Sequence, residues 1–133
     1  MDRFPNRVEI DLPALRHNLA GIRSLIPPGT AVMAVVKADA YGHGMVHAAG
    51  ALEAAGVERL AVAHLAEGVR LRRSGVRCPI VVLCGILTRE EAEAVVLHDL
   101  IPVLPEPALA GVLGDESRRR GKRTRVQLKI DTG

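Results

Sequence analysis

The chain alternates short apolar runs with longer segments of helical periodicity, and this alternation restricts its possible folds more than any other feature. The apolar runs recur at intervals of about 20 to 25 residues, which is typical of right-handed strand–helix–strand units in a parallel sheet. The alternation therefore predicts an α/β fold, with strands at residues 30–36, 59–63, 80–83, 101–104 and 125–130.

Helices are expected before the first strand and between successive strands. Asp11 is a candidate N-cap for the opening helix, in which leucine and isoleucine recur at helical spacing until Pro27 ends it. Thr88 can cap a later helix that carries three glutamates in its first turns, where they suit the helix dipole. The four linking helices are predicted at about residues 44–55, 65–74, 88 onward and 106–119.

Lys37 stands at the end of an uncharged run, residues 30–36, which follows Pro27-Pro28-Gly29. Such a run is typical of a strand buried on both faces of a parallel sheet, so Lys37 is expected at the carboxyl end of that strand. Ligand chemistry collects at this edge of α/β folds, and an amine that is desolvated there becomes a nucleophile towards a carbonyl. The alternative is an ordinary lysine that reaches solvent.

Tyr41 is the only tyrosine of the chain, and it lies in a polar turn where an aromatic ring has little core to fill. A phenol there can donate a hydrogen bond to an anion, and the turn Gly42-His43-Gly44 leads into a helix whose first N–H groups favour anions as well. Together with Lys37, the pattern suggests pyridoxal phosphate. The alternative is an ordinary turn covered by a tyrosine, because Gly-x-Gly alone is a weak signal.

Residues 36–44, Val-Lys-Ala-Asp-Ala-Tyr-Gly-His-Gly, resemble the cofactor-lysine signature of the alanine racemases, in which Asn or Asp is usual at the position of Asp39. Further stretches resemble the same family in the same order along the chain. They are residues 8–19, residues 59–63 followed by Glu67-Gly68, and residues 129–133. The resemblance thus covers nearly the whole sequence.

The resemblance implies the N-terminal half of a (β/α)8 TIM-type barrel, with an opening helix, five strands and four linking helices. It implies that Lys37 forms the Schiff base with pyridoxal 5'-phosphate and acts as one of two bases, and that Tyr41 binds the cofactor phosphate. Lys129 corresponds to a lysine that is carbamylated in some members; an unmodified strand lysine is the alternative. The second base of the family is a tyrosine from the partner subunit.

The implied function is that of an alanine racemase, which interconverts L-alanine and D-alanine for peptidoglycan precursor synthesis as a cytoplasmic homodimer. A racemase of other amino acids and a non-catalytic pyridoxal phosphate-binding barrel are the alternatives. The continuation Ala-Tyr-Gly-His-Gly after Lys37 favours a racemase over the small binding proteins.

The length of the chain constrains this interpretation. A complete barrel needs about 250 residues, and the chain has 133. We therefore expect residues 1–133 to be a truncated, partial cofactor-binding barrel domain, inactive alone, without the C-terminal half-barrel and the C-terminal β domain. Its first and fifth strands should present unpaired edges, and its inward side chains should face water. An open, flavodoxin-like sheet is the alternative.

Composition argues against several other classes of function. No apolar run reaches the 18 or more residues of a membrane span, and the first residues lack the apolar core of a signal peptide. Residues 118–125 carry the excess of positive charge, but without interleaved aromatic residues they indicate a solvated helix end rather than a nucleic-acid site. His43 and His47 have no third ligand at a suitable spacing, so no metal is expected, and Cys78 and Cys84 are expected as reduced thiols.

Overall fold

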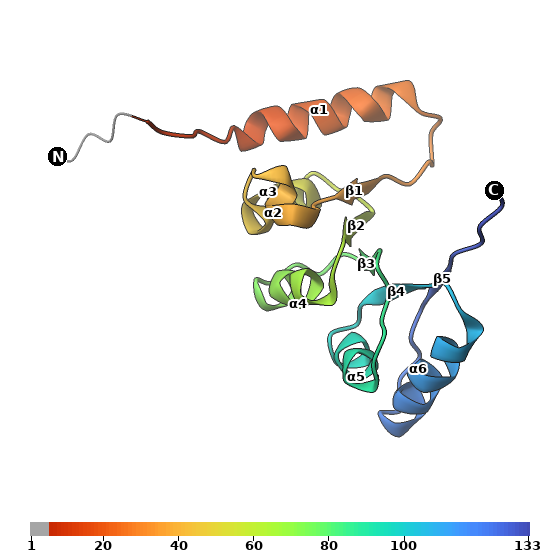
Figure 1. Cartoon of the computed structure of the whole chain (residues 1–133). Coiled ribbons are helices and arrows are strands. Elements are labelled where there is room, and N and C mark those ends of the chain that lie inside the picture. Colours follow the sequence, from red (N-terminus) through yellow and green to blue (C-terminus); the bar gives the residue numbers. More distant parts are fainter. Residues whose placement is uncertain (1–5) are drawn as a thin grey trace.

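All five predicted strands form in the computed structural model, which describes residues 6–133, and each strand pairs in parallel with its neighbour in sequence (Figure 1). The order β1-β2-β3-β4-β5 is that of successive barrel strands. A flavodoxin-like sheet would place its second strand at the edge, so that alternative is wrong. The strands are β1 (Met33–Val35), β2 (Arg59–Val62), β3 (Ile80–Val82), β4 (Ile101–Leu104) and β5 (Gln127–Leu128).

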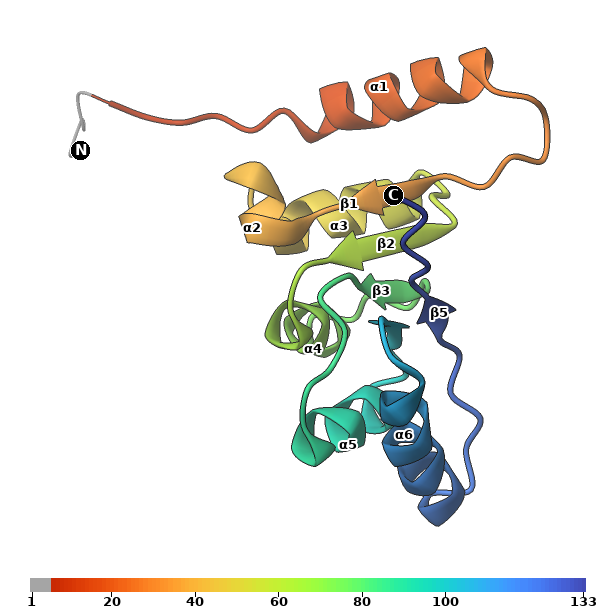
Figure 2. The same ribbon diagram turned by 45° about the vertical axis from the view of Figure 1, so that its right-hand side comes forward.

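The helices lie on one side of this curved sheet, as in the outer layer of a barrel (Figure 2). The opening helix packs against the first linking helix, and each linking helix follows one strand. The structure therefore confirms the predicted first half of a barrel. The helices are α1 (Leu12–Leu25), α3 (Met45–Ala54), α4 (Leu65–Arg73), α5 (Arg89–Leu97) and α6 (Pro107–Arg119), and a short element, α2 (Lys37–Tyr41), follows β1.

Local capping signals fix the starts of two helices where the sequence predicts them. The Asp11 carboxylate accepts the Ala14 N–H at 2.9 Å at the start of α1. At α5, the Thr88 hydroxyl accepts the Glu91 N–H at 3.2 Å, and the Glu91 carboxylate in turn accepts the Thr88 N–H. Each cap satisfies backbone donors that the helix itself leaves free.

The main core lies between the sheet and the helices, because alternate strand residues point outward to them. It includes Leu60, Val62, Ile80, Val82 and Leu104, together with Leu52, Leu71, Val95 and Leu113 from the helices. Each of these apolar side chains stabilises the fold by about 1.5–3 kcal/mol through burial.

The inner face of the sheet is only partly covered. Ala61, Val81 and Ile101 form a small buried cluster in its middle, whereas Met33 and Val35 of β1 are 41% and 39% exposed. The expectation that inward side chains face water is confirmed at β1 but not in the middle of the sheet, and the expectation that the first strand is buried on both faces is wrong. The reason is that β1 is an edge strand, so it has a neighbour on one side alone within residues 6–133.

The last strand is shorter than predicted, since two residues, Gln127 and Leu128, are assigned to the ladder instead of 125–130. It also is an edge strand, and Leu128 is 68% exposed. Cys78 and Cys84 are free thiols, as expected; Cys78 is partly buried and Cys84 is exposed. Within the described part of the chain, no helix has the length and apolar character that crossing a bilayer requires.

Candidate active site at the carboxyl end of the sheet

Lys37 directly follows the buried Val36, at the carboxyl end of β1. The Val36 N–H donates to the Ala61 carbonyl at 2.8 Å, so pairing with β2 continues up to the residue before the lysine. Lys37 is partly buried. The rigid sheet therefore holds the backbone on the N-terminal side of Lys37, at the edge where parallel α/β folds place their ligands.

The chain leaves Lys37 through a left-handed turn. Ala38, Asp39, Ala40 and Tyr41 have φ values of 50°, 53°, 55° and 53°. For residues with a Cβ atom this conformation costs roughly 1–2 kcal/mol each, or roughly 4–8 kcal/mol for the four. Such a turn persists when its surroundings hold it in place, and backbone strain of this kind clusters at functional sites. The sequence predicted a turn at these residues but not its left-handed conformation.

Asp39 holds the turn from within. Its carboxylate accepts the Met45 N–H at 2.9 Å, and its backbone carbonyl accepts the Gly44 N–H at 2.9 Å. The Ala40 carbonyl accepts both the N–H and the ring Nδ1–H of His43. The Asp39 carboxylate therefore occupies the first N–H of α3 with a negative charge, which removes one of the donors that the sequence suggested for an anion.

Glu67 holds the turn from the next unit of the fold. One carboxylate oxygen accepts the Ala38 N–H at 2.8 Å, and the other accepts the N–H groups of Ala63 and His64 at 2.8 and 3.0 Å. Burial acts to raise the pKa of Glu67, but these three hydrogen bonds outweigh it, and the pKa lies below its ordinary value. The carboxylate is therefore ionised at neutral pH.

Tyr41 ends the left-handed turn and is 62% exposed. Beside it, Asp39, Gly42 and the two histidines His43 and His47 line a cavity of about 410 Å³, together with Val8, Ile10, Leu12 and Gly44. In residues 6–133 no group of three side chains is arranged to hold a metal ion. The phenol of Tyr41 is accessible to a ligand at this edge.

Lys129 lies at the same end of the sheet, just beyond β5. Its N–H donates to the Leu104 carbonyl at 3.0 Å, which keeps it in register with β4. Its side chain is exposed and borders a cavity of about 280 Å³ whose other walls include Pro105, Leu128 and Ile130. The structure thus brings all three predicted site residues, Lys37, Tyr41 and Lys129, to the carboxyl edge of the sheet.

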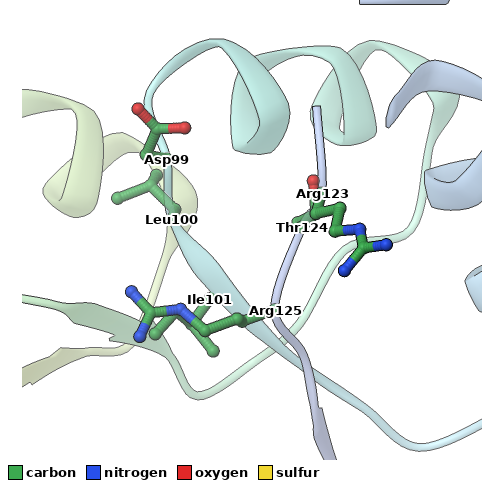
Figure 3. A pocket seen from close by; sticks show the side chains of 6 residues that line it. All are labelled: Asp99, Leu100, Ile101, Arg123, Thr124 and Arg125. Atoms are coloured by element: carbon green, nitrogen blue, oxygen red, sulfur yellow. The ribbon is translucent and has the colours of Figure 1, made fainter. Parts of the chain in front are cut away.

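A third cavity, of about 160 Å³, lies at the opposite edge, between the residues at the start of β4 and those that precede β5 (Figure 3). Asp99, Arg123 and Arg125 border it, but the two guanidinium groups point away from each other (Figure 3). Much of the neighbouring basic stretch is paired within the protein: Arg119 with Glu116 at 2.8 Å, and Lys122 with Asp99 at 3.0 Å. The charged side chains at this edge therefore do not point towards a common ligand position.

Sequence reasoning missed the roles of Asp39 and Glu67 in shaping the turn. Asp39 lies six residues before the N–H that it binds, outside the usual capping distance. Glu67 is three residues beyond His64, and a capping box is normally sought after serine or threonine. Its bond to Ala38 spans 29 residues, and no local sequence signal reports it.

Comparisons with known proteins agree with this geometry. Residues 10–133 match the family described as alanine racemase, N-terminal domain. The alanine racemase of Geobacter sulfurreducens is 45% identical over 133 residues, which is 100% of this chain and 35% of that protein. The alanine racemase of Synechocystis is 47% identical over 126 residues, or 95% of this chain and 34% of that protein.

Solved structures are similar in the same way. A structure of the Clostridium difficile 630 alanine racemase in complex with cycloserine aligns with a TM-score of 0.88 at 36% identity, over 93% of this chain and 34% of that one. The Streptomyces lavendulae enzyme aligns with a TM-score of 0.86 at 34% identity, over 98% and 34%. The chain spans about a third of the length of these relatives. By its sequence and its half-barrel fold, it belongs to the alanine racemase family.

Proposed function

We propose that this chain is the cofactor-lysine part of a racemase that interconverts L-alanine and D-alanine with pyridoxal phosphate. The observation that carries the proposal is Lys37, held at the carboxyl end of β1 by the ladder before it and by a braced left-handed turn after it. The name shared by the curated relatives, alanine racemase, supports the substrate. We place residues 1–133 in a barrel domain that is completed elsewhere in a longer protein.

The residues at this edge fit the cofactor in two respects. A partly buried amine, Lys37, suits a Schiff base with the aldehyde, and an exposed phenol, Tyr41, suits a phosphate oxygen. The first N–H of α3 does not contribute, because Asp39 occupies it. We assign phosphate binding by this chain to Tyr41, with the remaining ligands supplied from outside residues 1–133.

Bound pyridoxal phosphate supplies an electron sink for the charge left on the α-carbon when its proton departs. Lys37 would hold the cofactor through its Nζ atom and would move the α-proton on one face of the substrate. Tyr41 would orient the cofactor by donating a hydrogen bond from its hydroxyl to the phosphate. Lys129, carbamylated or free, lies at the same edge of the sheet, and we assign it to the substrate side by its family counterpart.

A reductive-trapping experiment tests the role of Lys37. The chain has three lysines, Lys37, Lys122 and Lys129, so peptide mapping after treatment with pyridoxal phosphate and borohydride assigns every labelled side chain. We expect the label predominantly on Lys37. Lys122, which is bound to the Val96 carbonyl and to Asp99, is the internal reference. An even distribution over the three lysines would contradict the proposal.

The 133-residue chain alone should not racemise alanine. Its only tyrosine, Tyr41, is assigned to the phosphate, so no tyrosine remains to act as the base on the opposite face of the substrate. In the complete protein we expect this base to come from a second subunit of a homodimer. Measurable loss of optical activity from L-alanine in the presence of the chain and the cofactor would contradict this assignment.

A further inference from the structure

We propose that Glu67 is a positioning residue for Lys37, which acts by tying the left-handed turn to the adjacent strand–helix unit. The inference rests on the proposed role of Lys37 as the cofactor lysine. Glu67 itself lies three residues into the α4 segment that begins after His64, and its carboxylate is directed back to the sheet edge.

The two oxygens of the carboxylate have separate partners. Oε2 accepts the N–H groups of Ala63 and His64 at 2.8 and 3.0 Å, which ties it to the end of β2. Oε1 accepts the Ala38 N–H at 2.8 Å, which ties it to the turn. Both oxygens are needed, because the three donors approach from two different segments of the chain.

The Ala38 N–H belongs to the peptide bond that joins Lys37 to Ala38. Fixing the plane of this peptide fixes the ψ angle of Lys37, because the plane is rigid. On the other side, the Val36 carbonyl belongs to the peptide bond that joins Val36 to Lys37, and it accepts the Ala40 N–H at 2.9 Å. Glu67 therefore completes the restraint of the Lys37 backbone, from which its side chain projects.

Glu91 provides a matched comparison one unit further along the chain. It has the same place in its helix, and its Oε2 accepts the Leu87 and Thr88 N–H groups at 2.6 and 3.2 Å. Both of these donors are local, whereas one donor to Glu67 comes from a segment 29 residues away. The bond between units thus distinguishes Glu67 from an ordinary capping glutamate.

The test compares Glu67→Gln with Glu91→Gln in the 133-residue chain. An amide offers one acceptor oxygen, so Glu67→Gln cannot satisfy donors on both sides. We expect it to speed amide hydrogen exchange at Ala38 about 10-fold or more, the effect of losing one charge-assisted hydrogen bond. It should also reduce the fraction of trapped pyridoxal phosphate found on Lys37.

Glu91→Gln should leave both quantities unchanged. Unchanged exchange and unchanged Lys37 labelling in Glu67→Gln would overturn the inference, as would an equal effect of Glu91→Gln. If wild-type Lys37 is not labelled preferentially, the proposed function fails, but the exchange rate of Ala38 still decides whether Glu67 holds the turn.

A double variant covers the case in which Glu67→Gln does not fold. Glycine adopts the left-handed conformation without steric cost, so Ala38→Gly should relieve the turn. We expect Glu67→Gln with Ala38→Gly to recover part of the preference for Lys37. A double variant that folds without recovering it, or that still fails to fold, would show that Glu67 does not act through the turn.

Discussion

Gly85 is the residue whose replacement tests the packing of the site edge most directly. It follows β3 at the carboxyl end of the sheet, is buried, and has a φ of 71°. A Cβ atom at this position would overlap the Val103 carbonyl oxygen of β4 and would lie 3.8 Å from Pro105. Gly85→Ala should therefore push the carboxyl ends of β3 and β4 apart.

The expected loss has two parts. The left-handed conformation costs alanine roughly 1–2 kcal/mol. Making room for a methyl group against backbone adds roughly 1–3 kcal/mol. Gly75 provides the control, because it has a φ of 97° and nothing within 4 Å of its Cβ position. Gly75→Ala should lose only the first part, so the free energies of unfolding of the two variants should differ by roughly 1–3 kcal/mol.

Urea unfolding followed by far-UV circular dichroism measures both variants. With an m-value of about 1–3 kcal/mol/M, the midpoint of Gly85→Ala should lie about 1 M below that of Gly75→Ala. The comparison requires equal m-values, since a change in m would report on the denatured state. Equal midpoints for the two variants would refute the close approach of Gly85 to Val103.

Three further predictions concern charge and accessibility. The pKa of Glu58 falls from 4.5 to about 2 through its hydrogen bond from Arg23. Its stabilising contribution is therefore present above pH 4.5 and is lost as the pH falls towards 2. Glu58→Gln should flatten the dependence of α1 amide exchange on pH between these two values. Burial, with Glu53 nearby, raises the pKa of Cys78 from 9.0 to about 11. This lowers the thiolate fraction of Cys78 roughly 100-fold relative to a thiol of pKa 9.0. Iodoacetamide at pH 8 should therefore alkylate the exposed Cys84 before Cys78. Asp39→Ala should lower the free energy of unfolding by about 1 kcal/mol, because it removes the side chain that caps α3. Asp39→Asn keeps an acceptor oxygen and should lose less. Equal losses for the two variants in urea unfolding would contradict the capping role of Asp39.

Signals carried by neighbouring residues made much of the fold predictable. The spacing of the apolar runs predicted the five strands, and Asp11 and Thr88 marked helix starts because a cap acts within three residues. Lys37 was expected at the carboxyl edge because it ends an apolar run, and the resemblance to the racemases pointed to Tyr41 and Lys129. Each of these inferences depends on short stretches of sequence.

What the sequence did not reveal depends on contacts between distant residues. Nothing in Ala38-Asp39-Ala40 favours a left-handed turn, and the turn exists because Glu67 and the start of α3 hold it. The exposure of Met33 and the shortness of β5 likewise follow from the position of a strand in the sheet. An apolar run in the sequence has the same pattern whether its strand lies at the edge of the sheet or in the middle.

The 29 residues between Ala38 and Glu67 also set an order of events during synthesis. Ribosomes add about 5–20 residues per second, so roughly 1 to 6 s separate the appearance of the turn from that of its anchor. During this interval the four left-handed residues lack their bond to α4 and can sample right-handed conformations. The backbone around Lys37 should therefore become fixed only after the second strand–helix unit has been made.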